Sequence, residues 1–212
     1  MSKTLQLSPS GYRLYQHPKI QLVGNGDMEI FHAPDFVLPA ACEEIIAYAD
    51  RNNRPSEIAD HNGDYAFRTS TTSNLDPNMP VVAGIRNAIA GLIGLPLENG
   101  EPLQAQRYLP GQEFKLHCDW FRPGSPDYTK FCAISGQRTW TAMAYLNDVD
   151  EGGQTIFPHL GLSVTPKRGD LLIWNNLRPN GDGEPKSGHH AMPVIKGAKY
   201  VITQWFRQKP YR

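Results

Sequence analysis

The second half of the chain consists of short apolar runs separated by turn residues, and this pattern constrains the fold more than any other feature. The runs have the length of strands and follow one another closely after Gly100. They cover residues 103–109, 139–146, 155–157, 162–164, 171–174 and 200–206. Turn sequences stand between some of them: Pro110-Gly111, Gly152-Gly153 and Arg168-Gly169-Asp170. With 19 Gly and 18 Pro among 212 residues, the chain is predicted to be rich in strands and turns rather than a helix bundle.

The first half carries two helical patterns. Each begins at a proline, Pro39 and Pro80, which suits the first turn of a helix. Apolar residues recur at helical spacing after each one: Cys42, Ile45, Ile46 and Ala49, then Val82, Ile85, Ile89, Leu92 and Ile93. Two helices followed by many strands predict an α+β fold, with the helices covering one face of a barrel or sandwich.

The pattern along the chain predicts one main domain. Residues 1–27 are expected to hold a loosely attached polar leader (1–18) and a first strand. Residues 28–212 form the domain itself, with helical support over 28–100, including short strands within 28–37, and a β-core over 101–212. The polar segment 51–79 is long for a structureless connection and is expected to be partly ordered or a working loop.

Composition narrows the class of protein. Lys plus Arg and Asp plus Glu both number 21, so the formal net charge is zero. This argues against nucleic-acid binding by bulk charge and against a polybasic membrane anchor, although a local basic groove remains compatible. Three cysteines without a CxxC pair give no disulfide framework. No signal-peptide pattern opens the chain, and the longest apolar stretch, 88–97, is much shorter than the ~20 residues of a membrane span. We expect a cytoplasmic protein.

The first chemical signal is the tripeptide His117-Cys118-Asp119. Residues two apart in an extended chain face the same side, so His117 and Asp119 could bind one metal ion from one strand end. On its own the pattern is weak, because a hydrogen-bonded pair on a surface strand would have the same sequence.

His189, followed by His190, offers a third ligand far along the chain. Two histidines and one carboxylate on one face of an octahedral metal leave three positions for a bidentate cosubstrate and O2, which suits Fe(II). The same ligands would also suit Zn(II) in a hydrolase, which needs only one open position for water.

Lys199 favours the first of these metals. In the run 199–206, period two places Lys199, Val201, Thr203 and Trp205 on one face of a strand. A lysine on that apolar face is costly without an anionic partner. It could start the strand and extend to solvent. Once the metal ligands are granted, a ligand carboxylate deep in the pocket explains it better.

Together these segments resemble the prolyl 4-hydroxylase group of Fe(II)/2-oxoglutarate dioxygenases, over roughly residues 30–207. The resemblance is carried by residues 107–119, 136–138, 145–158 and 166–170, and by 189–194 continued through Lys199 to Trp205; Arg68-Thr69-Ser70 also looks like a segment of this family. It implies a double-stranded β-helix (jelly-roll) core with flanking N-terminal helices. It also implies His117, Asp119 and His189 as iron ligands, with His189 preferred over His190 because it lies four residues before Pro193.

The resemblance also implies roles around the metal. Lys199 matches the residue that pairs with the far carboxylate of 2-oxoglutarate, Tyr108 and Thr155 match side chains that hydrogen-bond the same region, and Trp205 matches an aromatic beside it. Arg138 matches a position associated with a peptide substrate.

The segments 54–79 and 120–136 are candidate lids over the pocket. The second holds Arg122, Lys130 and the aromatics Trp120, Phe121, Tyr128 and Phe131. A peptide in a groove would use aromatics such as Trp120 and Tyr128 to hold a proline ring, and basic residues to hold carbonyls or acidic neighbours. A solvated loop with ordinary packing aromatics is the alternative.

The implied activity is hydroxylation of prolyl residues in a peptide or protein. Fe(II) is the cofactor, 2-oxoglutarate and O2 are cosubstrates, succinate and CO2 are released, and ascorbate is the expected reductant of oxidised iron. The expected partner is a proline-containing substrate, without nucleic acid or membrane, and a homodimer is the assembly considered.

Three alternatives stay open at this point. The same chemistry could act on a free amino acid or another small metabolite. An alkylation-repair oxygenase is disfavoured because that group anchors 2-oxoglutarate with Arg, where this chain has Lys199. A catalytically idle barrel is disfavoured because all three ligands are present. Departures from the family pattern, among them Cys118, Trp120, His190, Met192 and Tyr200, leave the substrate open.

Overall fold

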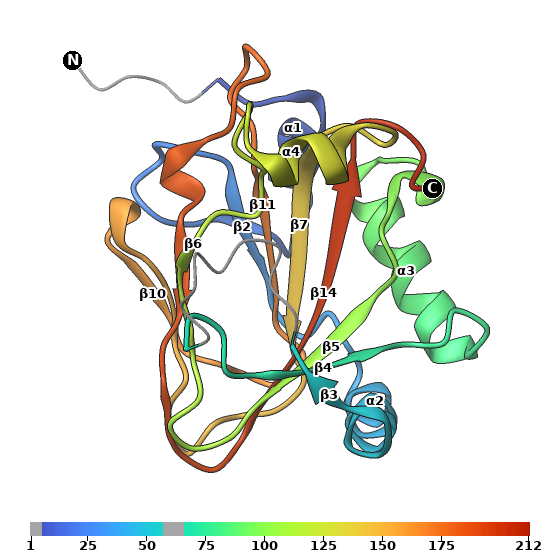
Figure 1. The fold of residues 1–212 in the computed structure, drawn as a ribbon, viewed down its shortest axis with the longest axis vertical. Coiled ribbons are helices and arrows are strands. Elements are labelled where there is room, and N and C mark those ends of the chain that lie inside the picture. Colours follow the sequence, from blue (N-terminus) through green and yellow to red (C-terminus); the bar gives the residue numbers. More distant parts are fainter. Residues whose placement is uncertain (1–5, 57–65) are drawn as a thin grey trace.

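The computed structural model describes residues 6–56 and 66–212, and its centre is a pair of antiparallel sheets that face each other (Figure 1). The larger sheet has the strand order β1-β2-β11-β7-β14-β5-β4-β3 and the smaller one β10-β9-β12-β6. Strands of the larger sheet are β1 (Gln21–Leu22), β2 (Ile30–Ala33), β3 (Arg54–Pro55), β4 (Thr71–Asn74), β5 (Gln104–Tyr108), β7 (Arg138–Tyr145), β11 (Leu171–Asn175) and β14 (Lys199–Arg207). Those of the smaller sheet are β6 (Phe114–His117), β9 (Thr155–Phe157), β10 (Leu162–Val164) and β12 (His189–Ala191), while β8 (Glu151–Gly152) pairs with β13 (Val194–Lys196). The expected double-stranded β-helix is confirmed.

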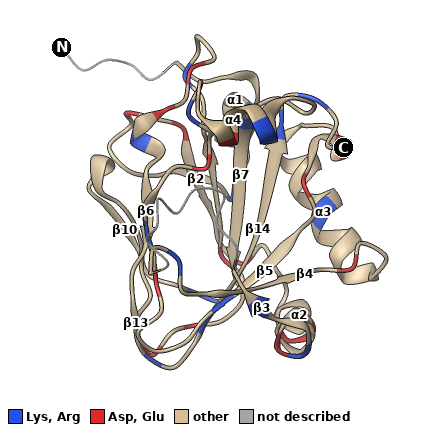
Figure 2. Ribbon diagram, viewed as in Figure 1, with Lys and Arg blue, Asp and Glu red and all other residues tan. Residues whose placement is uncertain are grey.

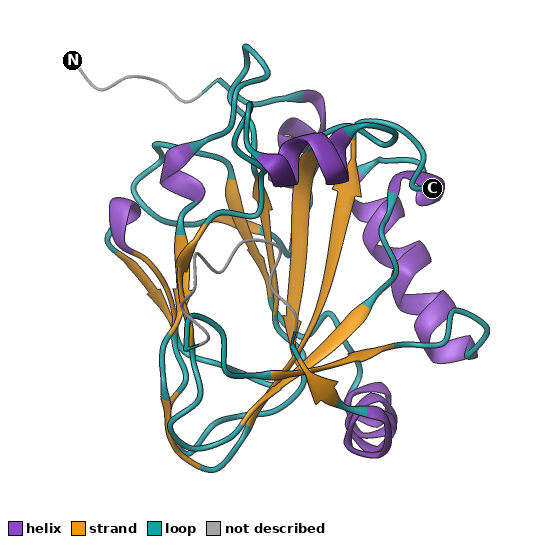
Figure 3. Ribbon diagram, viewed as in Figure 1, coloured by secondary structure: helices purple, strands orange, loops and turns teal. Residues whose placement is uncertain are grey.

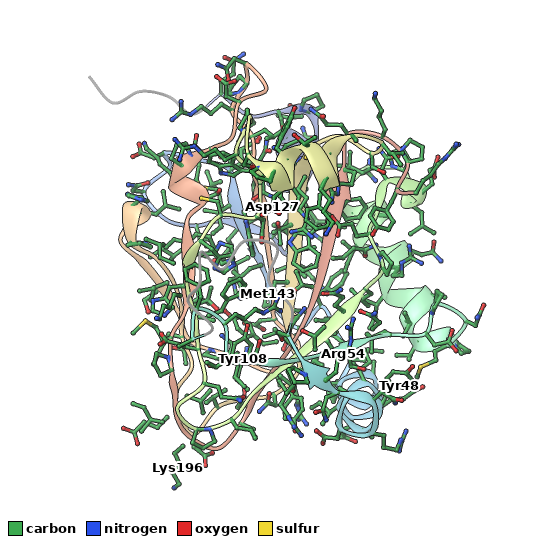
Figure 4. The ribbon with its side chains drawn as sticks, in the orientation of Figure 1. Tyr48, Arg54, Tyr108, Asp127, Met143 and Lys196 are labelled. Carbon is green, nitrogen blue, oxygen red and sulfur yellow. The ribbon has the colours of Figure 1, made fainter. Side chains whose placement is uncertain are left out.

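Alternation along the strands divides the core into two layers. In β7, Ala142 and Ala144 pack toward the helices, while Met143 and Tyr145 point between the two sheets. Figure 4 shows Met143 and Tyr108 in that inner layer. The period of two follows from the extended backbone, so one strand serves both layers. The inner layer is where polar side chains can approach one another from both sheets.

Helices α2 (Pro39–Asn52) and α3 (Pro80–Ile93) lie on the outer side of the larger sheet (Figure 3). Both begin at the predicted prolines. Most residues of the predicted stripes are buried: Cys42, Ile45 and Ala49 in α2, and Val82, Ile85, Ile89 and Ile93 in α3. Ile46 and Leu92 are only partly buried, and Ala90, which was not predicted, is buried as well. Gly94 ends α3 in the left-handed conformation, with φ of 78°. The helices therefore cover one face of the sheet, as the sequence predicts.

The expectation of a loosely attached leader is wrong for residues 9–15. They form α1 (Pro9–Tyr15), whose N-terminus is capped by Ser8. Leu14 is fully buried in the outer layer, and the Arg13 guanidinium donates hydrogen bonds to the carbonyls of Gly91 and Leu92 at the end of α3. The helix is held by these contacts, which a local reading of a polar, turn-rich segment does not reveal.

The segment 120–136 also contains a helix that the sequence analysis does not predict, α4 (Pro126–Cys132). Ser125 caps it by accepting a hydrogen bond from the Tyr128 N–H at 3.1 Å. Within 51–79 the structure has β3 and β4, so that segment is partly ordered as expected. Residues 57–65 of the first candidate lid lie outside the described residues.

Neither the distribution of charged residues nor the hydropathy of the described helices sets one part of the molecule apart. Figure 2 shows acidic and basic positions interspersed along the ribbon, with both signs on α4. Among residues 6–56 and 66–212, no helix combines the length and the apolar character needed to cross a bilayer.

Candidate metal centre and the groove that opens onto it

Strand pairing brings the two predicted histidine ligands together. β12 pairs with β6 so that His189 lies opposite His117, with ring centroids 4.2 Å apart. Asp119 follows β6 by two residues. Its Oδ1 lies 4.0 Å from Nε2 of His117, and its Oδ2 lies 4.0 Å from Nε2 of His189. The three ligand atoms lie within 4.8 Å of one another. The predicted convergence of these side chains is therefore confirmed.

His190 points the other way. Its Nε2 lies 2.8 Å from Oε2 of Glu113, as expected for the neighbour of an inward-facing residue on a strand. The preference for His189 over His190 agrees with this geometry.

Backbone carbonyls fix the tautomer of both inward-facing histidines. Nδ1 of His117 lies 2.7 Å from the Lys115 carbonyl, and Nδ1 of His189 lies 2.9 Å from the Ser187 carbonyl. Because a carbonyl can only accept, each Nδ1 carries the proton and each Nε2 lone pair faces Asp119. Burial, and next the neighbouring His189, lower the pKa of His117 well below its usual range, which keeps its imidazole neutral.

Two buried polar residues orient Asp119. The Thr141 hydroxyl donates to Asp119 Oδ2 at 2.7 Å, and the Asn176 side-chain amide donates to that hydroxyl oxygen at 2.8 Å. Both residues are fully buried. Neither residue belongs to a ligand motif, so the sequence does not single them out. Position 141 does fall on a predicted strand, but nothing marks it as a neighbour of Asp119.

Lys199 lies deeper in the inner layer, with only 1% of its surface exposed. Its ammonium donates to the Thr155 hydroxyl at 3.3 Å, and the Tyr145 hydroxyl donates to the same oxygen at 2.8 Å. Among the described residues no carboxylate forms an ion pair with Lys199, and burial lowers its pKa from 10.5 to about 7. The side chain does not reach solvent, so the alternative of an exposed lysine at the strand start is wrong.

A small cavity connects Lys199 to the metal ligands. Its volume is about 40 Å³, and its lining includes Tyr108, Thr155, Trp205 and all three predicted ligands. The predicted cosubstrate residues thus surround one space, together with Lys199 itself.

The cavity joins a groove of about 420 Å³, since Arg68, Phe114, His117, Asp119 and Trp205 line both. At the junction, the ring of Phe114 stacks on His117 and the Arg68 guanidinium carbon lies 4.7 Å from the centre of that ring. A larger cavity of about 760 Å³ lies elsewhere and touches none of the three ligands. The chemistry-bearing space is the smaller one, because the three candidate ligands and Lys199 converge on it.

Comparison with known proteins agrees with this geometry. Residues 103–207 match the model of the 2OG-Fe(II) oxygenase superfamily. Prolyl 4-hydroxylase 13 of Arabidopsis thaliana is 31% identical over 202 residues, covering 86% of this chain and 72% of that protein. The chain belongs to the prolyl 4-hydroxylase family. Its cofactor is therefore Fe(II), with 2-oxoglutarate and O2 as cosubstrates.

Two solved structures share the fold of this prolyl 4-hydroxylase family member. A viral collagen prolyl hydroxylase of Paramecium Bursaria Chlorella virus-1, in its 2-oxoglutarate complex, has a TM-score of 0.68 at 24% identity and covers 87% of this chain and 98% of its own. A prolyl hydroxylase of Trichoplax adhaerens, solved with a peptide fragment of the hypoxia inducible factor oxygen degradation domain, has a TM-score of 0.62 at 15% identity. It covers 84% of this chain and 83% of its own.

The residues of this family member fit both Fe(II) and 2-oxoglutarate. Two neutral imidazole nitrogens and one carboxylate oxygen, without sulfur, form the donor set that non-haem Fe(II) oxygenases use. The buried ammonium of Lys199 supplies the positive charge that a dicarboxylate requires at the far end of the cavity.

The three residues predicted to contact the substrate differ from one another in their positions relative to the groove. Arg138 lines the groove, but Nε and Nη2 of its guanidinium both bind the Glu101 carboxylate, at 2.6 and 2.9 Å. Trp120 also lines the groove, while its indole N–H donates to the Glu184 carbonyl at 3.1 Å and so fixes the loop between β11 and β12.

Tyr128 is not among the groove-lining residues, and the expectation that it contacts substrate is not supported by its position. On α4 the residues that line the groove are Asp127 and Phe131, four positions apart on one helix face. Tyr128 is turned about 100° from Asp127 around the helix and is 37% exposed. The unpredicted helix is the reason for the difference.

Proposed function

We propose that this oxygenase hydroxylates prolyl residues in a peptide or protein substrate, with release of succinate and CO2. The observation that carries the proposal is one continuous space. It runs from the unneutralised ammonium of Lys199, past His117, Asp119 and His189, into an open groove. The name of the Arabidopsis relative and the peptide bound to the Trichoplax structure support a prolyl peptide as occupant of that groove.

We assign the metal to His117, Asp119 and His189. Carbonyl contacts hold the two imidazoles in the ligating tautomer, and Thr141 holds the carboxylate, so the donors are oriented before the metal binds. When bound, Fe(II) and 2-oxoglutarate together supply the oxidising chemistry, which no side chain of the chain could provide.

We assign the far carboxylate of 2-oxoglutarate to Lys199, with hydrogen bonds from the hydroxyls of Thr155 and Tyr108. Tyr145, which the sequence analysis missed, holds Thr155 in place through its own hydroxyl. Burial raises the pKa of Tyr108, which keeps its phenol a hydrogen-bond donor. Trp205 closes the side of this space and packs under the Arg138 guanidinium, 4.0 Å from its ring centre. The residues around the cosubstrate thereby exclude water from the reacting atoms.

The groove provides aromatic faces for a proline ring. Phe121, Phe131 and Trp205 line it on the side of α4 and β14. Their flat apolar surfaces suit a pyrrolidine ring, and the substrate backbone would lie between them and the metal.

Incubation of the purified protein with Fe(II), 2-oxoglutarate and a proline-rich peptide tests the proposal. We expect formation of succinate and a peptide heavier by one oxygen atom, located on proline by fragmentation. The Asp119→Ala variant is the control and should form neither product. Succinate formation that no peptide stimulates, without a peptide mass gain, would contradict the prolyl assignment and favour a small-molecule substrate.

A further inference from the structure

The groove carries more positive than negative side chains, and one of its cations, Arg122, has no hydrogen-bond or ion-pair partner among the residues that the structure describes. Its lining includes four arginines (Arg68, Arg122, Arg138 and Arg207) and three carboxylates (Glu101, Asp119 and Asp127). Asp119 belongs to the metal centre. Arg138 and Arg207 share the single buried carboxylate of Glu101, so that cluster keeps a net positive charge.

Arg122 differs from the other arginines of the groove. It is exposed at the rim, and within residues 6–56 and 66–212 its side chain forms no hydrogen bond or ion pair, not even with Asp127 on the same wall. An exposed guanidinium is fully hydrated and costs nothing to leave unpaired, but it offers a planar pair of donors to an incoming carboxylate.

The backbone that carries Arg122 is held firmly. The buried side chain of Gln137 accepts from the Phe121 N–H at 2.9 Å and donates to the Phe121 carbonyl at 2.7 Å. The Arg122 carbonyl accepts from the Ser125 N–H at 3.0 Å, and Ser125 in turn caps α4. The free cation therefore starts from a fixed point on the groove wall, three residues beyond the Asp119 ligand.

We propose that Arg122 binds an acidic side chain that flanks the target proline, so that this oxygenase prefers prolyl peptides with Asp or Glu beside the hydroxylated residue. This inference rests on the proposed function. The occupant is a peptide because the groove supplies aromatic faces for proline and a separate cation at its rim. Charge complementarity with Arg122 favours an acidic residue next to that proline.

A set of matched peptides tests the assignment. Each contains one proline in a neutral host, with Asp, Asn or Lys placed in turn on either side of it. For the natural chain we expect kcat/KM in the order Asp, Asn, Lys on one of the two sides. Each step should be about threefold to fivefold, the size of an exposed ion pair, and should arise in KM. Because the charge is at the rim, the order should flatten at high salt.

The charge-reversed variant makes the test specific. Arg122→Glu should invert the order of the three peptides, and Arg122→Gln should remove it. Lys130→Gln is the matched control, since Lys130 is an exposed cation of the same segment that does not line the groove, and this variant should keep the natural order.

The outcomes separate the two proposals. Equal turnover of all peptides by the natural chain, or an unchanged order in Arg122→Glu, would overturn the assignment of Arg122 and leave prolyl hydroxylation intact. Hydroxylation of none of the peptides would overturn the proposed function, and this inference with it. An order that Lys130→Gln abolishes equally would assign the preference to general charge rather than to Arg122.

Discussion

Lys199 is the residue at which burial and charge conflict most strongly. Its ammonium is enclosed between the two sheets, with the Thr155 hydroxyl and the rings of Tyr108 and Tyr145 as its nearest polar and aromatic neighbours. Folding places it there without an anion, and burial lowers its pKa to about 7. Such an arrangement costs stability and is explained by a ligand that restores the charge balance.

Replacing Lys199 by Met should weaken 2-oxoglutarate binding far more than metal binding. The apolar side chain keeps most of the volume but removes the charge, and loss of one partner of a buried pair costs about 3 kcal/mol, or roughly a hundredfold in affinity. Calorimetric titration without O2 measures both ligands, with Fe(II) alone as the control. An equal loss of both affinities would make Lys199 a structural residue.

Binding of 2-oxoglutarate should also weaken as pH rises. Below about 7 the Lys199 side chain is protonated in the free protein and can pair with a carboxylate, whereas above its lowered pKa the neutral amine must first take up a proton. We expect the dissociation constant to rise by up to about tenfold per pH unit above that pKa. The measurement is calorimetry with Fe(II) from about pH 6.5 to about pH 8.5, and an identical slope in Lys199→Met would contradict the assignment.

Thr141 gives a prediction for the metal itself. Thr141→Val removes the donor to Asp119 and leaves the Asn176 amide without its acceptor, so Fe(II) affinity should fall by about tenfold to a hundredfold. Thr141→Ser keeps the hydroxyl and should retain most of the affinity. Metal titration of the apoprotein compares the variants. Equal affinity in all three would show that Asp119 needs no orienting partner.

At the scale of elements, long segments are predictable and short helices are not. The 14-residue helices α2 and α3 repeat their apolar stripe over several turns, and the strands of the β-core alternate with turn residues between them. Helices α1 and α4 have only seven residues each. Two turns are too few to establish a period, so a cap and the contacts of the folded chain determine them.

Helix α1 should therefore contribute to stability through one side chain. Leu14 is completely buried, so Leu14→Ala should lower the free energy of unfolding by about 2–5 kcal/mol. Tyr12 on the same helix is 56% exposed, and Tyr12→Ala should change it by at most about 0.5 kcal/mol. Urea unfolding of the two variants provides the comparison. A small effect of both substitutions would mean that α1 is only loosely attached.

At the scale of the whole molecule, the site depends on strand pairings that are distant in sequence. Lys199 lies opposite Tyr108, and His189 lies opposite His117, while Thr155 comes from the neighbouring strand of the smaller sheet. The Lys199 end of the cosubstrate space is thus built by both sheets, whereas the two histidine ligands come from the smaller one. The jelly roll brings the two sheets close enough for one ligand to touch both.

The sequence by itself determined the local pattern: six strands of the β-core (β5, β7, β9, β10, β11 and β14), the two long helices, the inward face of β14 and the three candidate ligands. These follow from the fixed periods of extended and helical backbone, which act over a few residues. Only the tertiary structure decided the contacts of the polar side chains: Thr141 orients Asp119, Tyr145 holds Thr155, and Glu101 forms an ion pair with Arg138. It also decided that Tyr128 does not line the groove. The contacts join residues whose separation in the chain carries no periodic signal, and the orientation of Tyr128 depends on a helix too short to show a period. Packing of the whole molecule therefore selects them.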